Sequence, residues 1–308
     1  MLSYIIRRFL QTLIVLFVVT VCAFALVRLA PGNPARLMLP DEATDEQVAA
    51  MEARLGLDKP LYEQYFNYIL GVLQGDLGMS TVYRQPIGRI IMARLPITVI
   101  LAVGTVLLGS LLAIPLGVIA GAKRGSIIDF LSLLFALLFQ SMPNIWVGVM
   151  LILIFSVELG WLPVLGGASF AHFVMPVVTL GTSMASTLTR VARSGMADTL
   201  SEDYITATYA RGISRFKVYT KYALRNALIP VITLIGLNLG LYLAGSVVIE
   251  TIFSMGGIGQ LMNQSVNGRD YAAVQSLLLI SACMFTVINF FVDIINSFVD
   301  PRLSLLSK

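Results

Sequence analysis

Six long apolar stretches constrain this chain more than any other feature of its sequence. They lie at residues 9–29, 97–120, 130–157, 173–189, 227–249 and 273–299. About 20 apolar residues in a helix cross a bilayer core, so each stretch is long enough, or nearly so, to span a membrane. Only 12% of the residues are charged, against about 25% in soluble domains. We therefore expect one all-α integral membrane domain over residues 1–308, with six transmembrane helices.

The positive charges predict which ends of these helices face the cytoplasm. The N-terminal end, the loops after the second and fourth stretches and the C-terminal tail hold 13 of the 21 cationic residues, namely Arg7, Arg8, Lys123, Arg124, Arg190, Arg193, Arg211, Arg215, Lys217, Lys221, Arg225, Arg302 and Lys308. The short loops on the other side, 158–172 and 250–272, hold only Arg269. Both termini are therefore predicted to be cytoplasmic, and the long segment 30–96 external, because long segments translocate largely regardless of charge.

The external segment 30–96 has helical patterns of its own. Residues 47–57 have helical spacing, with Thr44 or Asp45 as the N-cap and Gly56 at the end. Residues 62–73 form a second amphipathic stretch that is rich in aromatic side chains, which are typical of a membrane interface. Two interpretations stay open: short helices lying on the outer headgroups, or a docking platform for a soluble partner.

The loop 190–226 between the fourth and fifth stretches predicts two short helices around a glycine. Ser201 is the expected N-cap of the first helix, whose first turn holds Glu202 and Asp203. Gly212 is expected just past its end, and Ser214 as the cap of the next helix. Two capped helices with small and apolar side chains favour a protein-docking knob over a solvated loop.

This loop resembles the coupling loop of bacterial ABC importer permeases, known as the EAA motif. With Gly212 aligned, residues 206–208 (Thr-Ala-Thr) stand over Glu-Ala-Ala and keep only the middle alanine. The match is closer to the branch of dipeptide, oligopeptide, nickel and glutathione permeases, through 202–205 (Glu-Asp-Tyr-Ile), 210–212 (Ala-Arg-Gly) and 224–230 (Leu-Arg-Asn-Ala-Leu-Ile-Pro). The resemblance implies that ATPase coupling involves Glu202, Asp203, Tyr204, Ala207, Ala210, Arg211, Gly212, Arg225 and Asn226.

The resemblance extends over essentially the whole chain. Residues 30–34 look like the family opening, although Asn33 stands where Asp is usual. Other segments similar to the first-subunit type of this branch are 55–61, 75–80, 269–271 and 300–302. Residues 256–259 read Gly-Gly-Ile-Gly where the family has Pro-Gly-x-Gly, so we expect a looser external turn there.

The resemblance implies a pore-forming subunit of an ATP-driven, binding-protein-dependent importer of small peptides in the bacterial inner membrane. A phosphate-binding loop of the form Gly-x4-Gly-Lys-Ser/Thr does not occur in the sequence. We therefore expect no enzymatic activity and no cofactor on this chain, with ATP and Mg held by partner subunits. The implied partners are a second homologous six-helix permease, two ATP-binding subunits and an external substrate-binding protein. Membrane lipid surrounds the chain, and no nucleic acid is expected.

Two alternatives remain open. A nickel or metal-chelate permease belongs to the same branch, although the single His172 and the two cysteines in apolar runs, Cys22 and Cys283, predict no metal cluster. An ion-coupled secondary transporter places ionisable residues near the membrane midplane, and here Asp293 is the one carboxylate well inside a stretch.

The substrate path is predicted where polar residues interrupt the apolar stretches. Pro143 interrupts the third stretch and predicts a kink, beside Gln140, Ser141 and Asn144. Polar residues of the fourth and fifth stretches add Ser183 and Asn238. The alternative is that these side chains hydrogen-bond one helix to another. The pairs Gly117/Gly121 and Gly236/Gly240 are expected to be close-packing faces.

Overall fold

The computed structural model describes the chain except for residues 1, 30–33, 38, 41, 165–168 and 300–308. The predicted motifs at 30–34 and 300–302 therefore lie largely outside the described residues, as do Arg302 and Lys308. The described residues form helices and one isolated antiparallel bridge, between Met79 and Pro86. The all-helical class is confirmed.

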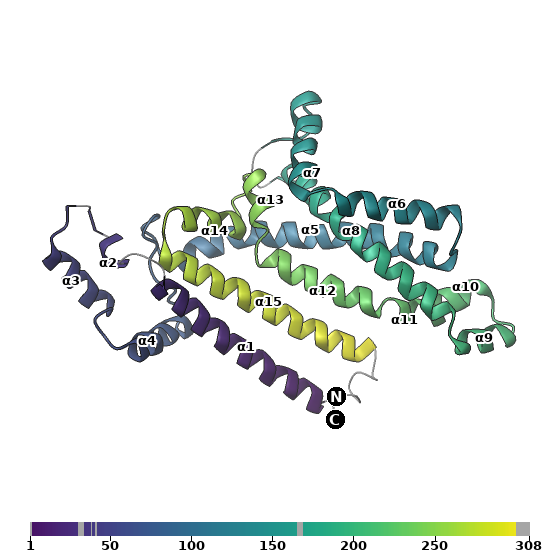
Figure 1. Cartoon of the computed structure of the whole chain (residues 1–308), viewed down its shortest axis with the longest axis horizontal. Helices are drawn as coiled ribbons and strands as arrows, with labels where there is room; N and C mark the ends of the chain where they lie inside the picture. Colours follow the sequence, from purple (N-terminus) through teal and green to yellow (C-terminus); the bar gives the residue numbers. More distant parts are fainter. Residues whose placement is uncertain (1, 30–33, 38, 41, 165–168, 300–308) are drawn as a thin grey trace.

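The body of the molecule is made of helices that run back and forth along its length (Figure 1). They are α1 (Leu2–Leu29), α5 (Ile87–Ala122), α6 (Ile127–Ser141), α8 (Phe170–Leu200), α12 (Ile229–Leu243) and α15 (Tyr271–Val299). At one end, called here the α9 end, lie the start of α1, the end of α15, α9 (Asp203–Ala210), α10 (Arg215–Lys217), the π-helix η2 (Val218–Ala223) and α11 (Leu224–Ala227). At the other, the α14 end, lie α2 (Pro34–Leu37), α3 (Asp45–Leu55), α4 (Leu61–Leu73) and α14 (Ile258–Asn267).

Among the described residues, three helices are long and apolar enough to cross a membrane, over Ile5–Leu26, Ile87–Ala122 and Tyr271–Phe298. Up to five spans result if each of two bent pairs is counted, Ile127–Ser141 with Asn144–Glu158 and Arg215–Ala227 with Ile229–Leu243. The long helix α8 does not meet this criterion. Its hydroxyl-bearing residues and arginines lower its hydropathy, and part of its polar surface is exposed.

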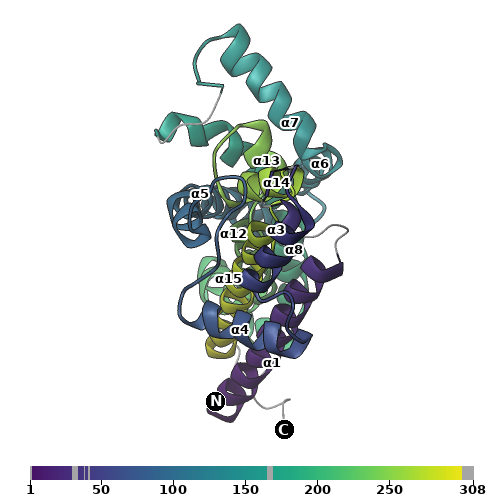
Figure 2. The same cartoon turned by 90° about the vertical axis from the view of Figure 1, so that its left-hand side faces the viewer.

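The third predicted span is broken rather than merely kinked. Met142 has an extended backbone, with φ −83° and ψ 123°, and Pro143 becomes the N-cap of α7 (Asn144–Leu151). The helix α7 and the following π-helix η1 (Ile152–Glu158) stand at 93° to α6. They rise out of the body of the molecule (Figure 2). Pro143 lacks the N–H that a continuous helix would use, so the chain turns where that hydrogen bond is missing.

The centre of the fold is the packing of α5 against α8, which depends on small residues. A Cβ atom at Gly117 would lie 2.6 Å from the carbonyl oxygen of Thr189, and one at Gly121 would lie 2.5 Å from that of Arg193. Likewise, Gly236 and Gly240 of α12 pack against Val292 and Phe285 of α15. The prediction of close-packing faces is therefore confirmed for both glycine pairs.

The two helices predicted in the segment after α1 are present as α3 and α4, close to the predicted bounds, and the short helix α2 precedes them. The Thr44 side chain accepts the N–H of Gln47, whose side chain accepts the N–H of Thr44. This capping box starts α3, and Gly56 ends it in a left-handed conformation (φ 65°). The helix α4 packs on α1 through Tyr65, whose hydroxyl lies 2.8 Å from Thr20 Oγ1.

Candidate functional site

The helix α9 begins one residue later than the sequence predicts. Ser201 is the last cap of α8, and its hydroxyl donates to the carbonyl of Ala197. Glu202 is the N-cap of α9, with an extended backbone, so the expectation that Ser201 caps this helix is wrong. The long helix α8 continues to Leu200, so Ser201 ends α8 instead of starting α9. Gly212 follows α9 with φ 74°, as predicted for a glycine that lets the chain turn.

An apolar cluster seats α9 on the body of the molecule. Its buried members are Met196, Ile205, Val218, Ala223 and Ala227, with Val118 and Ala122 of α5 packed against them. Only Ile205 and Thr208 of α9 are buried. The α9 helix therefore rests through one side on η2 and on the cluster at the ends of α5 and α8. Its other residues are exposed, although Tyr204 also contacts Tyr222 and Asn226 of its own chain.

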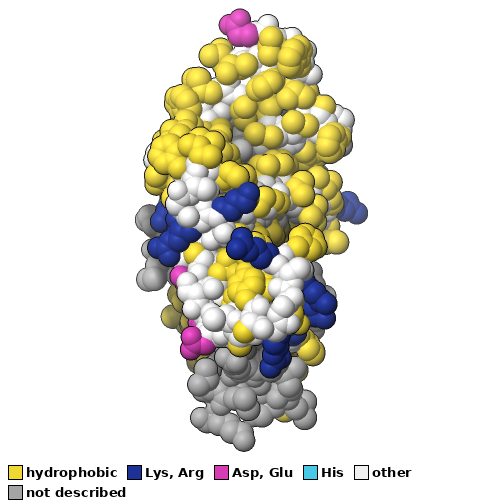
Figure 3. Space-filling view, turned by 90° about the vertical axis from the view of Figure 1, so that its right-hand side faces the viewer, with side chains coloured by type: hydrophobic (Ala, Val, Ile, Leu, Met, Phe, Trp, Pro, Cys, Tyr) yellow, Lys and Arg dark blue, Asp and Glu magenta, His cyan; other side chains and the backbone are white. Residues whose placement is uncertain are grey.

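The predicted coupling residues lie together on that outer surface. Glu202, Asp203, Tyr204, Ala207, Ala210, Arg211, Gly212, Arg225 and Asn226 are all exposed. Two of them meet directly, since the Asn226 Nδ2 donates to the Tyr204 hydroxyl at 2.9 Å. Lys and Arg side chains stand around this end of the molecule (Figure 3).

Behind α9 the chain runs through a π-helix that the sequence analysis did not predict. The turn η2 leads into α11, and α11 approaches α8 so closely that a Cβ at Gly195 would lie 2.6 Å from the carbonyl oxygen of Ala227. Gly195 was the available sequence signal, because a glycine inside a helix often marks a close approach of another backbone.

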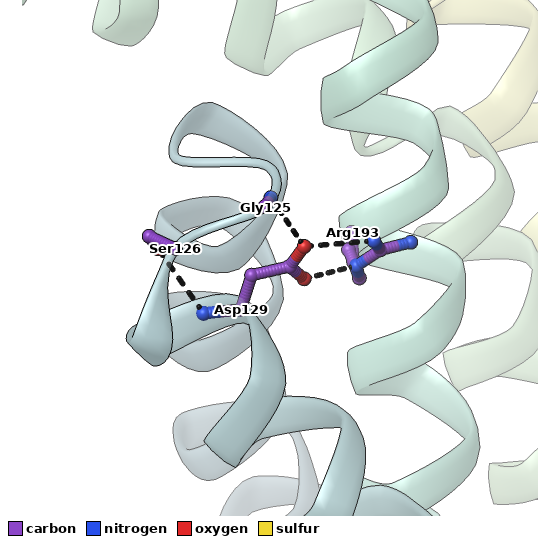
Figure 4. A network of polar contacts seen from close by, with 4 residues as sticks. All are labelled: Gly125, Ser126, Asp129 and Arg193. Carbon is purple, nitrogen blue, oxygen red and sulfur yellow. Dashed lines mark hydrogen bonds and ion pairs between the residues drawn. The ribbon is translucent and has the colours of Figure 1, made fainter.

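A second polar contact ties the α9 end together, and the sequence analysis missed it. Arg193 of α8 forms a two-pronged ion pair with Asp129 at the start of α6 (Figure 4). The Gly125 N–H also donates to this carboxylate, at 2.9 Å, and Ser126 caps α6 by accepting the N–H of Asp129. The Asp129 side chain is only 6% exposed. Paired and hydrogen-bonded in this way, it fixes the loop between α5 and α6 against α8.

The predicted path residues fall into two places. Asn144 lines an open hollow of about 410 Å³ at the helix break, whose other walls are Pro143, Ile145, Leu180 and residues 245–249. The contribution of Gly245 and Ser246 was not predicted, because nothing in their sequence distinguishes them from a turn. Gln140 lies apart from the hollow and accepts a hydrogen bond from the guanidinium of Arg190.

The remaining path residues bond within their own helices. The Ser141 hydroxyl donates to the carbonyl of Leu137, and Asn238 donates to that of Leu234. Ser183 is half-buried, and its carbonyl accepts from the Ser186 hydroxyl. Each of these bonds lies within one helix and joins no two helices. A hydrogen bond between helices is instead made by Asn296 of α15, which donates to Thr233 of α12.

No group of three metal-binding side chains is found among the described residues. Asp293, the carboxylate predicted well inside an apolar stretch, lies 3.2 Å from the guanidinium of Arg8 in an ion pair between α15 and α1.

Comparison with known proteins extends these observations to the whole chain. Residues 113–305 match the family described as "Binding-protein-dependent transport system inner membrane component", and residues 1–102 match its N-terminal companion model. The glutathione transport system permease protein GsiC of Escherichia coli K12 is 39% identical over 303 residues, covering 98% of this chain and 99% of that protein. GsiC of Salmonella typhimurium LT2 shows the same identity and coverage.

Among solved structures, an inward-facing form of the MetNI methionine ABC transporter matches with a TM-score of 0.57 and 21% identity. The match covers 68% of this chain and 96% of the other, so the two share a fold over the larger part of this chain. The family resemblance inferred from the motifs is thereby confirmed. The chain belongs to the inner membrane components of binding-protein-dependent transport systems, the permease subunits of ABC importers.

Proposed function

We propose that this chain is one of two pore-forming subunits of an importer of small peptides, with glutathione-like tripeptides as its cargo. The near full-length similarity to GsiC supports that cargo. In this proposal the chain crosses the bacterial inner membrane six times with both termini in the cytoplasm. A second permease, two ATP-binding subunits and an external binding protein complete the importer.

The observation that carries the proposal is the way in which α9 is seated. The helix presents a polar, small-residue face outward while Ile205 and its neighbours fix it to the ends of α5 and α8. An ATP-binding subunit that docks on this face would push on two of the longest helices, α5 and α8, through this apolar cluster and η2. The packing of α5 against α8 would carry that movement through the body of the molecule.

A substitution at Gly212 tests the coupling. A β-branched side chain is strained at φ 74°, by about 1–2 kcal/mol for the left-handed region. We expect Gly212→Val to reduce ATP-dependent uptake of labelled glutathione at least tenfold, in proteoliposomes that contain all subunits and the binding protein. Gly160→Val is the matched control, since Gly160 has φ 63°, has open space around it and lies away from α9.

Three outcomes separate the alternatives. Equal uptake by the Gly212→Val and Gly160→Val importers contradicts the coupling role. Uptake by the purified chain alone, driven by an ion gradient, favours a secondary transporter. Accumulation of a nickel chelate, with no accumulation of glutathione, favours the metal branch of the family.

A further inference from the structure

One face of α8 carries polar side chains that are not covered by the described chain. Ser183, Thr187 and Arg190 are spaced four and three residues apart, so they lie on one side of the helix. Ser183 is half-buried, and Thr187 and Arg190 are exposed. Leu180, one turn before Ser183 on the same side, lines the hollow at the helix break. A polar stripe therefore leads along α8 from this hollow to Arg190.

The direction of the Arg190 side chain is unusual for a membrane protein. The helices α6 and α8 lie side by side and run in opposite directions (Figure 1). Arg193 reaches Asp129 at the start of α6, whereas Arg190 reaches Gln140 near its end. Asp129 and Gln140 are separated by about 16 Å along the helix. The Arg190 guanidinium thus points away from the α9 end and toward the helix break, although arginines of membrane helices normally extend toward the nearest water.

Arg190 also differs from Arg193 in its charge balance. Arg193 is neutralised by Asp129. Arg190 donates a hydrogen bond to the neutral amide of Gln140, and no carboxylate of the described residues lies within ion-pair distance of it. A guanidinium presents five donors in a planar fork, and Gln140 takes only a part of them. The remaining donors are free to bind a carboxylate in two-pronged geometry.

We propose that Arg190 and Gln140 form a subsite that binds the carboxylate of a peptide as it passes along α8. The inference rests on the proposed function and adds to it the chemical group that the path recognises. When no substrate is bound, the hydrogen bond from Arg190 to Gln140 holds the guanidinium in the substrate path. An arriving carboxylate takes the free donors, and the polar stripe toward the hollow provides hydroxyl groups for the rest of the peptide.

Uptake by the complete importer tests this subsite, with glutathione and trialanine as probes. Arg190→Gln is expected to lower ATP-dependent uptake of both at least tenfold, while ATP hydrolysis stimulated by the loaded binding protein stays within twofold. Arg190→Lys is expected to keep an intermediate rate, because it retains the charge and loses the fork. Arg124→Gln, at an exposed arginine of the loop between α5 and α6, is the matched control and should transport normally.

Substitutions at Gln140 separate binding from a structural tie between α6 and α8. Gln140→Glu places a fixed carboxylate against Arg190, where it competes with the cargo while strengthening the contact between the helices. Uptake should fall at least tenfold without a loss of thermal stability. Gln140→Leu removes the tie and leaves the guanidinium available, so uptake should stay within threefold of normal. This pair decides the question even if the Arg190→Gln importer fails to assemble.

The outcomes distinguish the subsite from the function on which it rests. Normal uptake by the Arg190→Gln or Gln140→Glu importer overturns the subsite and leaves the proposal of a peptide importer intact. Normal uptake is also the result expected if Arg190 binds lipid phosphate instead of cargo. A normally assembled wild-type importer that accumulates neither probe overturns the peptide cargo and the subsite together.

Discussion

The α14 end of this molecule and the seat of the helix α9 are held together by different chemistry. At the α14 end, Asp270 is fully buried and accepts hydrogen bonds from the Ser80 hydroxyl and from the N–H groups of Val82 and Ala273. Glu250, in the short helix α13 (Val247–Ile252), is also fully buried and accepts from Thr98. At the α9 end, the buried pair of Asp129 and Arg193 fixes the loop between α5 and α6, but the helix α9 itself rests mainly on apolar side chains.

This difference separates a region that keeps one geometry, the α14 end, from a region whose contacts can shift, the seat of α9. Hydrogen bonds to a buried carboxylate hold their donors within a narrow range of distances and angles. Apolar contacts are non-directional, so side chains can slide while staying buried. The α14 end is therefore built to keep one geometry, and the seat of α9 can accommodate small movements of a docked partner.

The largest effect is expected when Asp270 is removed. Asp270→Ala leaves the Ser80 hydroxyl and two backbone N–H groups without their acceptor inside the protein, and it removes the cap of α15. We expect a loss of about 3 kcal/mol in the free energy of unfolding, measured by thermal unfolding in detergent. Asp76→Ala, in the segment that carries Ser80 but with an exposed side chain, should cost much less. Equal losses would mean that burial at this end is not decisive.

A smaller effect, which depends on pH, is expected at Glu250. Burial raises the pKa of Glu250, against the opposing hydrogen bonds from Gln260 and Thr98. The folded protein then binds the proton more tightly than the unfolded chain, so stability falls as the pH rises above the ordinary pKa of about 4.3.

Glu250→Gln should remove this slope. Each unit of pKa elevation corresponds to about 1.4 kcal/mol of stability lost by the wild type at high pH. Melting temperatures between pH 4 and pH 8 provide the measurement, with the exposed Glu158→Gln as the control. Parallel curves for wild type and Glu250→Gln would contradict the prediction.

The smallest effect is expected at the α9 end. Tyr204→Phe removes the acceptor for Asn226, but both side chains are exposed and water can replace the bond. The free energy of unfolding should change by less than about 1 kcal/mol. If Tyr204→Phe destabilised the protein as much as Asp270→Ala, the contrast between the two ends would fail.

Local features were predictable from the sequence because they depend on neighbouring residues. The capping box at Thr44, the left-handed glycines at 56 and 212 and the close-packed pair Gly117/Gly121 each follow from a residue's own backbone or helix face. The cap of α9 was misplaced by one residue because Ser201 and Glu202 can both precede a helix, and the length of α8 decided between them.

Contacts between distant segments were not predictable. The motifs at 75–80 and 269–271 were each noticed, but their meeting through Ser80 and Asp270 depends on how α5, α14 and α15 pack. The turn at Gly256 and Gly257 was expected to be loose without its proline. It is instead tied down, since Gln260 accepts the N–H of Gly256 at 2.6 Å and Gly257 lies against Glu250. A pattern within one turn does not reveal a buried carboxylate beside it.

The close contact of α5 with α8 has a mechanical consequence. Backbone atoms of the two helices approach so closely at Gly117 and Gly121 that neither helix can tilt alone. The 31 residues of α8 form a lever about 46 Å long. A tilt of about 5° at the end that bears α9 would displace the far end, where Phe170 begins the helix, by about 4 Å, more than the diameter of a water molecule.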